Sequence, residues 1–402
     1  MLIAAEHLLT AETKADATAD PAVDHVPGPG FVEVTDGVIG AVGPGMRRAD
    51  MTLADGYLLP GLVDLQVNGY YGVEFQIADA ASWAQVTARL PETGTTACLP
   101  TMITAPVSAL AEALRTAAMF VPDLPASGTR VLGVHAEGPF IAPGRRGAHN
   151  EKWITDPTPS AVAELTEAGR GLLRLVTIAP ELPGALAAIE QLAAAGVLVS
   201  VGHTDATAGQ VAAAAQRGAR MVTHLFNAQR PLGHREPGVV GQALTDERLT
   251  SGLIVDLHHV VEAVCGLAFR AAPGRIALVT DAVAAAGMPP GEYLLGGELI
   301  TLPPGDGAPP VRGDGTLAGS ALRMDRAVAN AVQCGLSLPA AVAAATRIPA
   351  DLIGRPDLGR LLPGAAADLV WLSPELRTRA TWIAGRLVYT DGAAATLAAV
   401  AA

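Results

Sequence analysis

The sequence predicts an α/β protein: a (β/α)8, TIM-like barrel that carries a small β-sandwich domain. Short, continuous apolar runs alternate with alanine-rich helical stretches through the middle of the chain, a pattern typical of a parallel sheet buried on both faces. Eight such runs within 402 residues favour a closed barrel over an open, doubly wound sheet. No GxGxxG turn follows the first run, which also weighs against a dinucleotide-binding sheet.

The predicted strands and helices follow one another along the middle of the chain. The strands are expected at 62–67, 96–102, 130–136, 173–179, 197–202, 221–224, 252–256 and 275–281. Helical patterns lie between several of them, at 82–90, 108–119, 183–195 and 208–216. We therefore assign residues 56–362 to the barrel.

The two ends of the chain differ from its middle. Residues 1–55 contain short alternating strands and turns, as in FVEVTDGVIGAVG, and residues 363–402 show the same pattern, as in ADLVWLSPELRTRATWIAGRLVYTDG. Neither end could bury its own apolar face alone. We expect the two ends to combine into one small β-sandwich domain beside the barrel.

Composition excludes several classes of protein. A formal charge of −12 argues against a nucleic-acid binder, although local Arg or His residues still permit an anionic substrate. The three cysteines are far apart and form no CxxC pair, so neither a disulfide framework nor a structural zinc site is expected. No signal-peptide pattern and no apolar stretch of membrane-spanning length occurs, which predicts a cytoplasmic protein without a membrane partner.

Four acidic or imidazole side chains stand at the ends of different predicted strands. Glu137 follows the third strand, His203 the fifth, His224 the sixth and Asp281 the eighth. The C-terminal strand ends of a barrel face one mouth, so these side chains are expected to converge. One carboxylate and two imidazoles suit Zn²⁺ or another divalent first-row metal with open positions for water. Asp281 could then take a proton from that water and return it to a leaving group.

Each of these residues also has a structural explanation. A single histidine at a strand end is usually only a hydrogen-bonding residue, and Glu137 could be a solvated turn residue. Asp205, two residues after His203, could cap the next helix, and Asp281 could do the same. The structural explanation weakens because all four candidates fall at ends of different strands.

An ordered series of motifs carries a family resemblance over residues 50 to 390. The series runs PGLVDLQVNG, HAEGPF, GHTDA, THLFNA, HREPGVVG, LVTDAVAAAGMPPGEYLLGG, TLAGSAL and PGAAADLVWL. It resembles the N-acetylglucosamine-6-phosphate deacetylase family of the amidohydrolase superfamily. The resemblance implies a barrel with a β-sandwich and hydrolysis of the acetamide of N-acetylglucosamine 6-phosphate in amino-sugar catabolism.

Roles for single residues follow from the same resemblance. It implies metal ligands at Glu137, His203 and His224, a catalytic aspartate at Asp281, and His149 of GAHN as a residue that polarises the acetyl carbonyl. Positions that contact the substrate correspond to Ala148, Asn227, Ala228, Arg235, His259, Leu317, Ala318 and Gly319. Arg235 and His259 match phosphate-binding positions, and that arginine is expected to reach in from the neighbouring subunit of a homodimer.

Some positions depart from the commoner patterns. Many amidohydrolases carry HxH at the end of the first strand, whereas this chain has Gln66 and Asn68 there. Neutral amides are weak ligands, so we expect one tightly held metal ion, with Zn²⁺ favoured over Fe, Co or Mn. Of the adjacent His258 and His259, only one should reach the site if both lie on a strand, and His259 is our choice. Tyr70, Tyr71 and Leu257 stand where small residues are frequent, which leaves the exact sugar specificity open.

Three alternatives stay open at this point. The first is deacetylation of N-acetylgalactosamine 6-phosphate, and the second is hydrolysis of another amide. The third is a non-catalytic sugar-phosphate-binding protein, against which the presence of Asp281 argues, because a binding module needs no base. For Arg235, a surface ion pair with Glu236 is the structural alternative.

Overall fold

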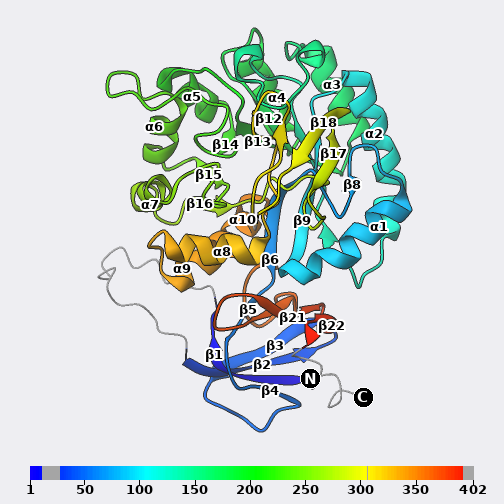
Figure 1. Ribbon diagram of the computed structural model, residues 1–402, viewed down its shortest axis with the longest axis vertical. Helices are drawn as coiled ribbons and strands as arrows, with labels where there is room; N and C mark the ends of the chain where they lie inside the picture. The colour runs from blue at the N-terminus through cyan, green and yellow to red at the C-terminus, as the bar shows by residue number, and fades with distance from the viewer. Residues whose placement is uncertain (11–27, 306, 393–402) are drawn as a thin grey trace.

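The computed structural model describes residues 1–10, 28–305 and 307–392. Its larger part is a barrel of eight parallel strands (Figure 1). In chain order these are β6 (Leu62–Val67), β9 (Thr95–Ile103), β11 (Val134–Glu137), β12 (Leu173–Ile178), β13 (Leu198–Val201), β14 (Ala219–Val222), β15 (Thr250–Leu253) and β16 (Ile276–Leu278). A two-residue strand, β10 (Arg130–Val131), also pairs with β9. All residues of β6 and β9 are buried, as expected for strands covered on both faces.

One helix follows each barrel strand. These helices are α1 (Ala80–Arg89), α2 (Val107–Phe120), α3 (Pro159–Ala168), α4 (Ala185–Ala194), α5 (Ala208–Gln216), α6 (Gly238–Thr245), α7 (Glu262–Ala271) and α8 (Met324–Gln333). Two more, α9 (Leu338–Ala345) and α10 (Arg347–Leu352), pack near the bases of β6 and β16. Among the described residues, no helix has the length and apolar character needed to cross a membrane. The predicted barrel is confirmed.

The strands at the two ends of the chain form a separate sheet, drawn below the barrel in Figure 1. Its order is β22 (Arg386–Thr390), β21 (Thr378–Ile383), β20 (Leu369–Leu372), β5 (Tyr57–Pro60), β1 (Leu2–Leu8), β2 (Gly28–Thr35) and β3 (Val38–Pro44), with β4 (Met51–Leu53) beside β1. It has its own apolar core around Trp382. The predicted pairing of the two ends is therefore present. Residues 11–27 and 393–402 of that prediction lie outside the described residues, and the bounds 1–55 and 363–402 stay a proposal.

A three-stranded antiparallel sheet lies in the connection between β16 and α8. Its strands are β17 (Gly291–Leu295), β18 (Glu298–Leu302) and β19 (Val311–Arg312), and none of them was predicted from the sequence. A smaller hairpin, β7 (Gly69–Tyr70) with β8 (Val73–Glu74), follows β6. Both insertions lie after the C-terminal ends of barrel strands, where a (β/α)8 barrel has its mouth.

A buried carboxylate joins the first and last barrel strands. Asp64 of β6 accepts hydrogen bonds from the backbone N–H of Gln66 and of Thr280, and from the Thr280 hydroxyl at 2.5 Å. Burial raises the pKa of Asp64 to about 7, although these hydrogen bonds oppose the rise. The backbone N–H of Asp281 also donates to the Gln66 carbonyl at 2.9 Å. These contacts between residues 64–66 and 280–281, called the seam below, therefore position the site residue Asp281.

We expect Asp64→Ala to lower the free energy of unfolding by about 3 kcal/mol, because buried donors of Gln66 and Thr280 lose their acceptor. The apparent Tm should fall by about 5 °C in scanning calorimetry. Asp156→Asn, at an exposed position, serves as the control. An unchanged Tm for Asp64→Ala would show that this seam contributes no stability.

Candidate active site

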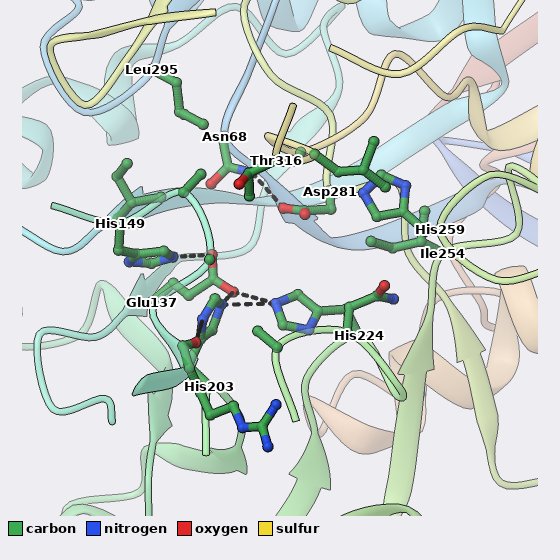
Figure 2. A pocket seen from close by; sticks show the side chains of 18 of the residues that line it. Asn68, Glu137, His149, His203, His224, Ile254, His259, Asp281, Leu295 and Thr316 are labelled. Carbon is green, nitrogen blue, oxygen red and sulfur yellow. Dashed lines mark hydrogen bonds and ion pairs between the residues drawn. The ribbon is translucent and has the colours of Figure 1, made fainter. Parts of the chain in front are cut away.

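A cavity of about 290 Å³ opens at the C-terminal ends of the barrel strands (Figure 2). Glu137 ends β11, His203 follows β13, His224 follows β14 and Asp281 follows β16. Leu295 of β17 and Thr316, which follows β19, line the same cavity. The expected convergence of the four strand-end residues is therefore present in the structure.

The backbone at these strand ends adopts an uncommon conformation. His203, His224 and Asp281 have φ values of 48°, 28° and 51°, in the left-handed region that non-glycine residues rarely occupy. Ala228 and Leu257, on neighbouring loops, have φ values of 50° and 67°. Such strain persists only where surrounding structure enforces it, and it is frequent at functional sites. Here it turns each side chain towards the cavity directly after its strand.

Three potential ligand atoms converge on one point, and they belong to Glu137, His203 and His224. The Oε1 atom of Glu137 lies 3.2 Å from Nε2 of His203 and 3.0 Å from Nε2 of His224, and the two Nε2 atoms are 3.0 Å apart. Ligands at about 2.1 Å around a tetrahedral zinc ion would be separated by about 3.4 Å. The observed triangle is close to that size, so these residues fit a divalent ion.

The electrostatics of this triangle also favour a cation. Burial raises the pKa of Glu137, but hydrogen bonds with His149, His203 and His224 outweigh it, so the pKa lies well below its ordinary value. Burial lowers the pKa of His224, yet its hydrogen bond with Glu137 and the charge of that carboxylate raise it overall. The Nδ1 atom of His203 lies 2.9 Å from the Arg145 carbonyl, which fixes its proton there and leaves Nε2 as a ligand atom.

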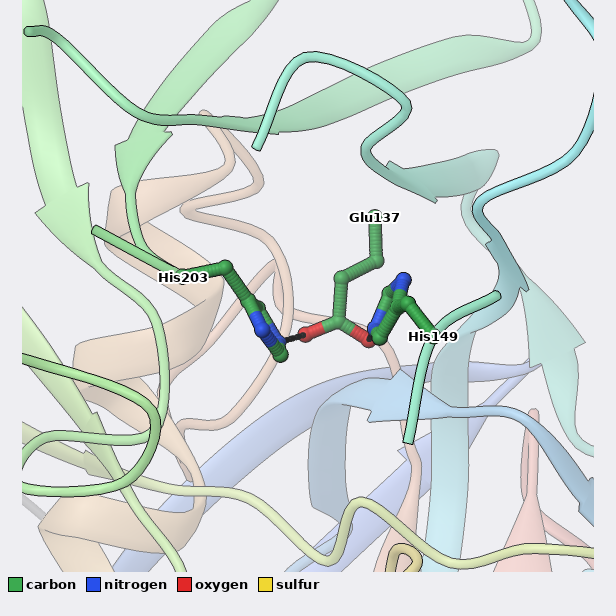
Figure 3. A group of neighbouring side chains, drawn as sticks. All are labelled: Glu137, His149 and His203. Atoms are coloured by element: carbon green, nitrogen blue, oxygen red, sulfur yellow. Dashed lines mark hydrogen bonds and ion pairs between the residues drawn. The ribbon is translucent and has the colours of Figure 1, made fainter. Parts of the chain in front are cut away.

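His149 faces the other oxygen of the same carboxylate (Figure 3). Its Nε2 lies 3.7 Å from Oε2 of Glu137, and ligand atoms of Glu137, His149 and His203 all lie within 4.8 Å of one another. On its far side, Nδ1 accepts from the backbone N–H of Thr104 at 3.3 Å and lies 2.7 Å from the Thr104 hydroxyl. Because Nδ1 accepts a backbone N–H, the neutral imidazole carries its proton on Nε2, as a donor towards the cavity.

Thr104→Val is expected to lower kcat about fivefold, because His149 would lose one positioning hydrogen bond of about 1 kcal/mol. The metal content should stay unchanged, since the Thr104 hydroxyl donates to the main-chain carbonyl of Glu137, at 3.3 Å, and not to a candidate ligand atom. Thr166→Val, on α3, removes a hydroxyl that bonds only its own helix and is the control. Equal kcat values for Thr104→Val and Thr166→Val would show that Thr104 does not position His149 for catalysis.

Asp281 is held by two amides from the end of β6. The Nδ2 atom of Asn68 donates to Oδ1 of Asp281 at 2.6 Å, and Nε2 of Gln66 donates to the same oxygen at 3.1 Å. Nε2 of Gln66 also donates to Oε1 of Glu137 at 2.9 Å, so it links the two carboxylates. These two residues, which we expected only to be weak ligands, thus orient Asp281 and Glu137.

Asp281 has the pKa of a base suited to near-neutral conditions. Burial and, less strongly, the nearby charge of Glu137 raise the pKa of Asp281 to about 6, whereas His224, His259 and the hydrogen bond from Asn68 oppose the rise. A general base works best when its pKa is close to the operating pH. The alternative in which Asp281 merely caps a helix does not apply, because Arg323 is the N-cap of α8.

Most of the predicted substrate-binding residues line the cavity. They are Ala148, Asn227, Ala228, His259, Leu317 and Gly319. Ala318 is fully buried and does not line the cavity, where its neighbours do. Arg235 is exposed on the loop between β14 and α6 and does not reach the cavity of its own chain.

The structure also decides two alternatives about neighbouring residues. Glu236 accepts from the backbone N–H of Ala208 and Gly238, and among the described residues Arg235 forms no ion pair with it or with any other side chain. Asp205 pairs with Arg145 and Arg230 and caps no helix. The N-cap of α5 is Thr207.

His259 lies in the cavity for a different reason from the one that the sequence suggested. His258 and His259 follow β15 in a loop, so their alternation on a strand does not apply. Asp256 accepts from the backbone N–H of both histidines and from Nδ1 of His259 at 2.7 Å, which leaves Nε2 of His259 directed away from Asp256. Sequence reasoning missed Thr104 and Arg145, because their partners His149 and His203 lie 45 and 58 positions away. It also missed Asp256, whose partners are only two and three positions away.

An eight-stranded parallel barrel with a carboxylate and histidines at its C-terminal strand ends is the arrangement of a metal-dependent hydrolase of the amidohydrolase class. The amidohydrolase family model matches residues 57–388. N-acetylglucosamine-6-phosphate deacetylase of Danio rerio is 39% identical over 345 residues, which are 83% of this chain and 84% of the relative. N-acetylgalactosamine-6-phosphate deacetylase of Escherichia coli O157:H7 is 37% identical, over 89% of this chain and 94% of the relative.

Solved structures agree with these relatives. N-acetyl-D-glucosamine-6-phosphate deacetylase of Mycobacterium smegmatis, a mutant in complex with N-acetyl-D-glucosamine-6-phosphate, has a TM-score of 0.89 and 36% identity over 97% of this chain and 99% of its own. The deacetylase of Thermotoga maritima has a TM-score of 0.85 and 28% identity, over 97% and 100% of the two chains. The chain belongs to the amidohydrolase family and, within it, to the N-acetylglucosamine-6-phosphate deacetylases, as the motifs indicated.

Proposed function

We propose that this protein hydrolyses the acetamide of N-acetylglucosamine 6-phosphate to glucosamine 6-phosphate and acetate. The observation that carries the proposal is the meeting of Glu137, His203, His224 and Asp281 in one cavity of a chain from this family. A binding protein would need no buried, amide-held carboxylate such as Asp281 beside the triangle of ligand atoms. The reaction belongs to amino-sugar catabolism, and the charge of the sugar phosphate suits a cytoplasmic enzyme.

Glu137, His203 and His224 would hold one divalent ion, which when bound supplies a lowered pKa for a water molecule and polarisation of the acetyl carbonyl. We prefer this triangle to the set that contains His149, because its atoms are 3.0–3.2 Å apart whereas His149 lies 3.7 Å from Glu137. One oxygen and two nitrogen ligands favour Zn²⁺, with Fe, Co or Mn as alternatives.

Two side chains then carry the proton and the developing charge. Asp281 takes the proton of the attacking water and delivers it to the sugar nitrogen as the amide bond breaks. The Nε2–H of His149 donates to the acetyl oxygen, where negative charge develops during attack. His259 lies across the cavity from His149, beside Asp281 in Figure 2, and we assign it to the phosphate, so that remote binding energy positions the amide.

We assign Arg235 to the phosphate site of the neighbouring subunit, in a homodimer with shared active sites. Its exposure and its lack of an ion pair among the described residues support a role towards a second chain. A guanidinium group suits a phosphate because two parallel hydrogen bonds can form.

Mixed dimers provide the test of this arrangement. Arg235→Gln alone is expected to raise KM by about tenfold or more, since one charged contact contributes about 1.5–3 kcal/mol. Mixing Arg235→Gln chains with Asp281→Asn chains should restore a low KM in part of the dimers, because one site then has both residues. Arg170→Gln, at an exposed position, is the control partner. No restoration after demonstrated subunit exchange would place Arg235 outside the shared site.

The direct test of the function is acetate release from three sugars by metal-loaded enzyme, with a chelated control. The sugars are N-acetylglucosamine 6-phosphate, N-acetylgalactosamine 6-phosphate and unphosphorylated N-acetylglucosamine. Release that requires both the phosphate and the metal is expected, and fastest release from the gluco epimer would support the proposal. No release from any sugar by metal-loaded enzyme would redirect the assignment to another amide.

The galacto epimer is a second candidate substrate for a specific reason. A relative named for that activity is 37% identical to this chain over 94% of its own length. Faster release from N-acetylgalactosamine 6-phosphate than from its epimer would replace the substrate while leaving the reaction unchanged.

A further inference from the structure

A second cavity lies behind the loop that carries His259. Its volume is about 230 Å³, and it shares no lining residue with the active-site cavity. Asp256, Leu257 and His258 form one wall, α8 contributes Arg323 and Arg326, and Arg377 comes from the connection between β20 and β21. The cavity therefore lies where the barrel meets the small sheet domain.

The cationic side chains that line this cavity outnumber the anionic ones. Arg326 and Arg377 make no ion pair or side-chain hydrogen bond within the described residues, whereas Arg323 pairs with Asp325 at 2.8 Å. Arg326 is exposed, Arg377 is half-buried, and the exposed His258 adds a third group that can carry positive charge. Cations that line one cavity without anionic partners repel each other, so an anion between them would be stabilising.

Among the described residues, the carboxylates of Asp256 and Asp325 near this cavity are already engaged. Asp256 accepts three hydrogen bonds from His258 and His259, all at 2.7–2.9 Å. Asp325 is fully buried and accepts from Arg323 and from Thr378. Neither carboxylate is therefore the partner of Arg326 or Arg377.

The N-terminal end of α8 lies beside this cavity. α8 begins at Met324, and its N-cap residue Arg323 makes no side-chain capping bond. The first N–H groups of a helix lack partners within the helix, and its dipole favours negative charge at this end. Arg323 and Arg326, which line the cavity, are in or next to this first turn, and its acidic residue Asp325 is buried and bound to Arg323.

We propose that this cavity binds a phosphate monoester or inorganic phosphate, as a site separate from the active site. Guanidinium groups bind phosphate oxygens in bidentate pairs, which suits Arg326 and Arg377. The volume of 230 Å³ is below the roughly 300–1,000 Å³ of cavities that hold drug-sized ligands, so the occupant is small. A bound dianion would link α8 of the barrel to Arg377 of the small sheet domain.

The test is calorimetric titration of full-length, metal-loaded protein with inorganic phosphate and, in a second arm, with glucose 6-phosphate, which has no acetamide. The double variant Arg326→Gln/Arg377→Gln is compared with wild type and with Arg170→Gln/Arg386→Gln, in which two exposed arginines elsewhere are changed. The double variant should bind one equivalent fewer per chain, or bind that equivalent at least tenfold more weakly. The control should match wild type.

The two arms identify the source of the phosphate. Tighter binding of glucose 6-phosphate to the Arg326-dependent site would indicate a phosphorylated metabolite, and tighter binding of inorganic phosphate would indicate the free ion. Equal stoichiometry and affinity in wild type and double variant would overturn the proposal. Acetate release by the double variant, expected to equal that of wild type, shows that it has folded, and it separates this proposal from the assignment of the active site.

Discussion

Asp281→Asn is expected to lower kcat by about 10²–10⁴-fold, the range that a positioned general acid or base contributes. Asparagine preserves the size of the side chain and an oxygen that can accept from Asn68 and Gln66. It removes the ability to take a proton from water and to give it to the leaving nitrogen. Binding of the sugar phosphate and of the metal should remain, because the phosphate residues and Glu137, His203 and His224 are unchanged.

Three measurements separate a loss of proton transfer from a loss of binding: metal content, substrate affinity and single-turnover acetate release. Asp156→Asn, an exposed substitution of the same kind, should match wild type in all three. Near-normal turnover by metal-loaded Asp281→Asn would contradict the assigned role.

The pH dependence of wild type follows from the same carboxylate. The pKa of Asp281 is raised to about 6, and a base works in its ionised form, so kcat/KM should fall as the pH drops through that value. A bound cation would stabilise the ionised form and move this limb to lower pH. Asp281→Asn should lose this limb of the profile.

The barrel could be predicted from sequence because each strand is short, apolar and followed by a helix. The strand predicted at 62–67 has the bounds of β6, since both faces of the strand are buried and its apolar run is continuous. The segment 291–312 was not recognised as a small sheet. Its strands are exposed on alternate residues and are separated by glycines, so the pattern is weak. This sheet brings Leu295 to the cavity, which the barrel alone does not explain.

The candidate ligands could be predicted because strand ends in a barrel converge whatever their separation in sequence. The residues that hold them could not. Thr104 reaches His149 across 45 positions, and Asn68 reaches Asp281 across 213 positions. Threonine and asparagine occur at many loop positions, and nothing in their neighbouring residues marks the partner. The family resemblance supplied His149 and Arg235, which no spacing argument from the sequence had identified.

Loss of the metal should reduce activity at least as strongly as Asp281→Asn. Removal by a chelator is expected to reduce acetate release to background, and added Zn²⁺ should restore it. Release of an ion present at 1,000 times its dissociation constant would also remove about 4.1 kcal/mol of stability, so the Tm should fall and recover in parallel.

His224→Ala separates the metal site from other effects of chelation. The variant loses one of the three converging atoms, and the carboxylate of Glu137 loses a partner at 3.0 Å. Bound metal should fall well below one equivalent, and excess Zn²⁺ should restore neither activity nor Tm. His234→Ala removes an exposed histidine outside the cavity and should retain both. One tightly held equivalent of metal and normal turnover in His224→Ala would exclude this triangle and favour the set of Glu137, His149 and His203, whose ligand atoms also lie within 4.8 Å.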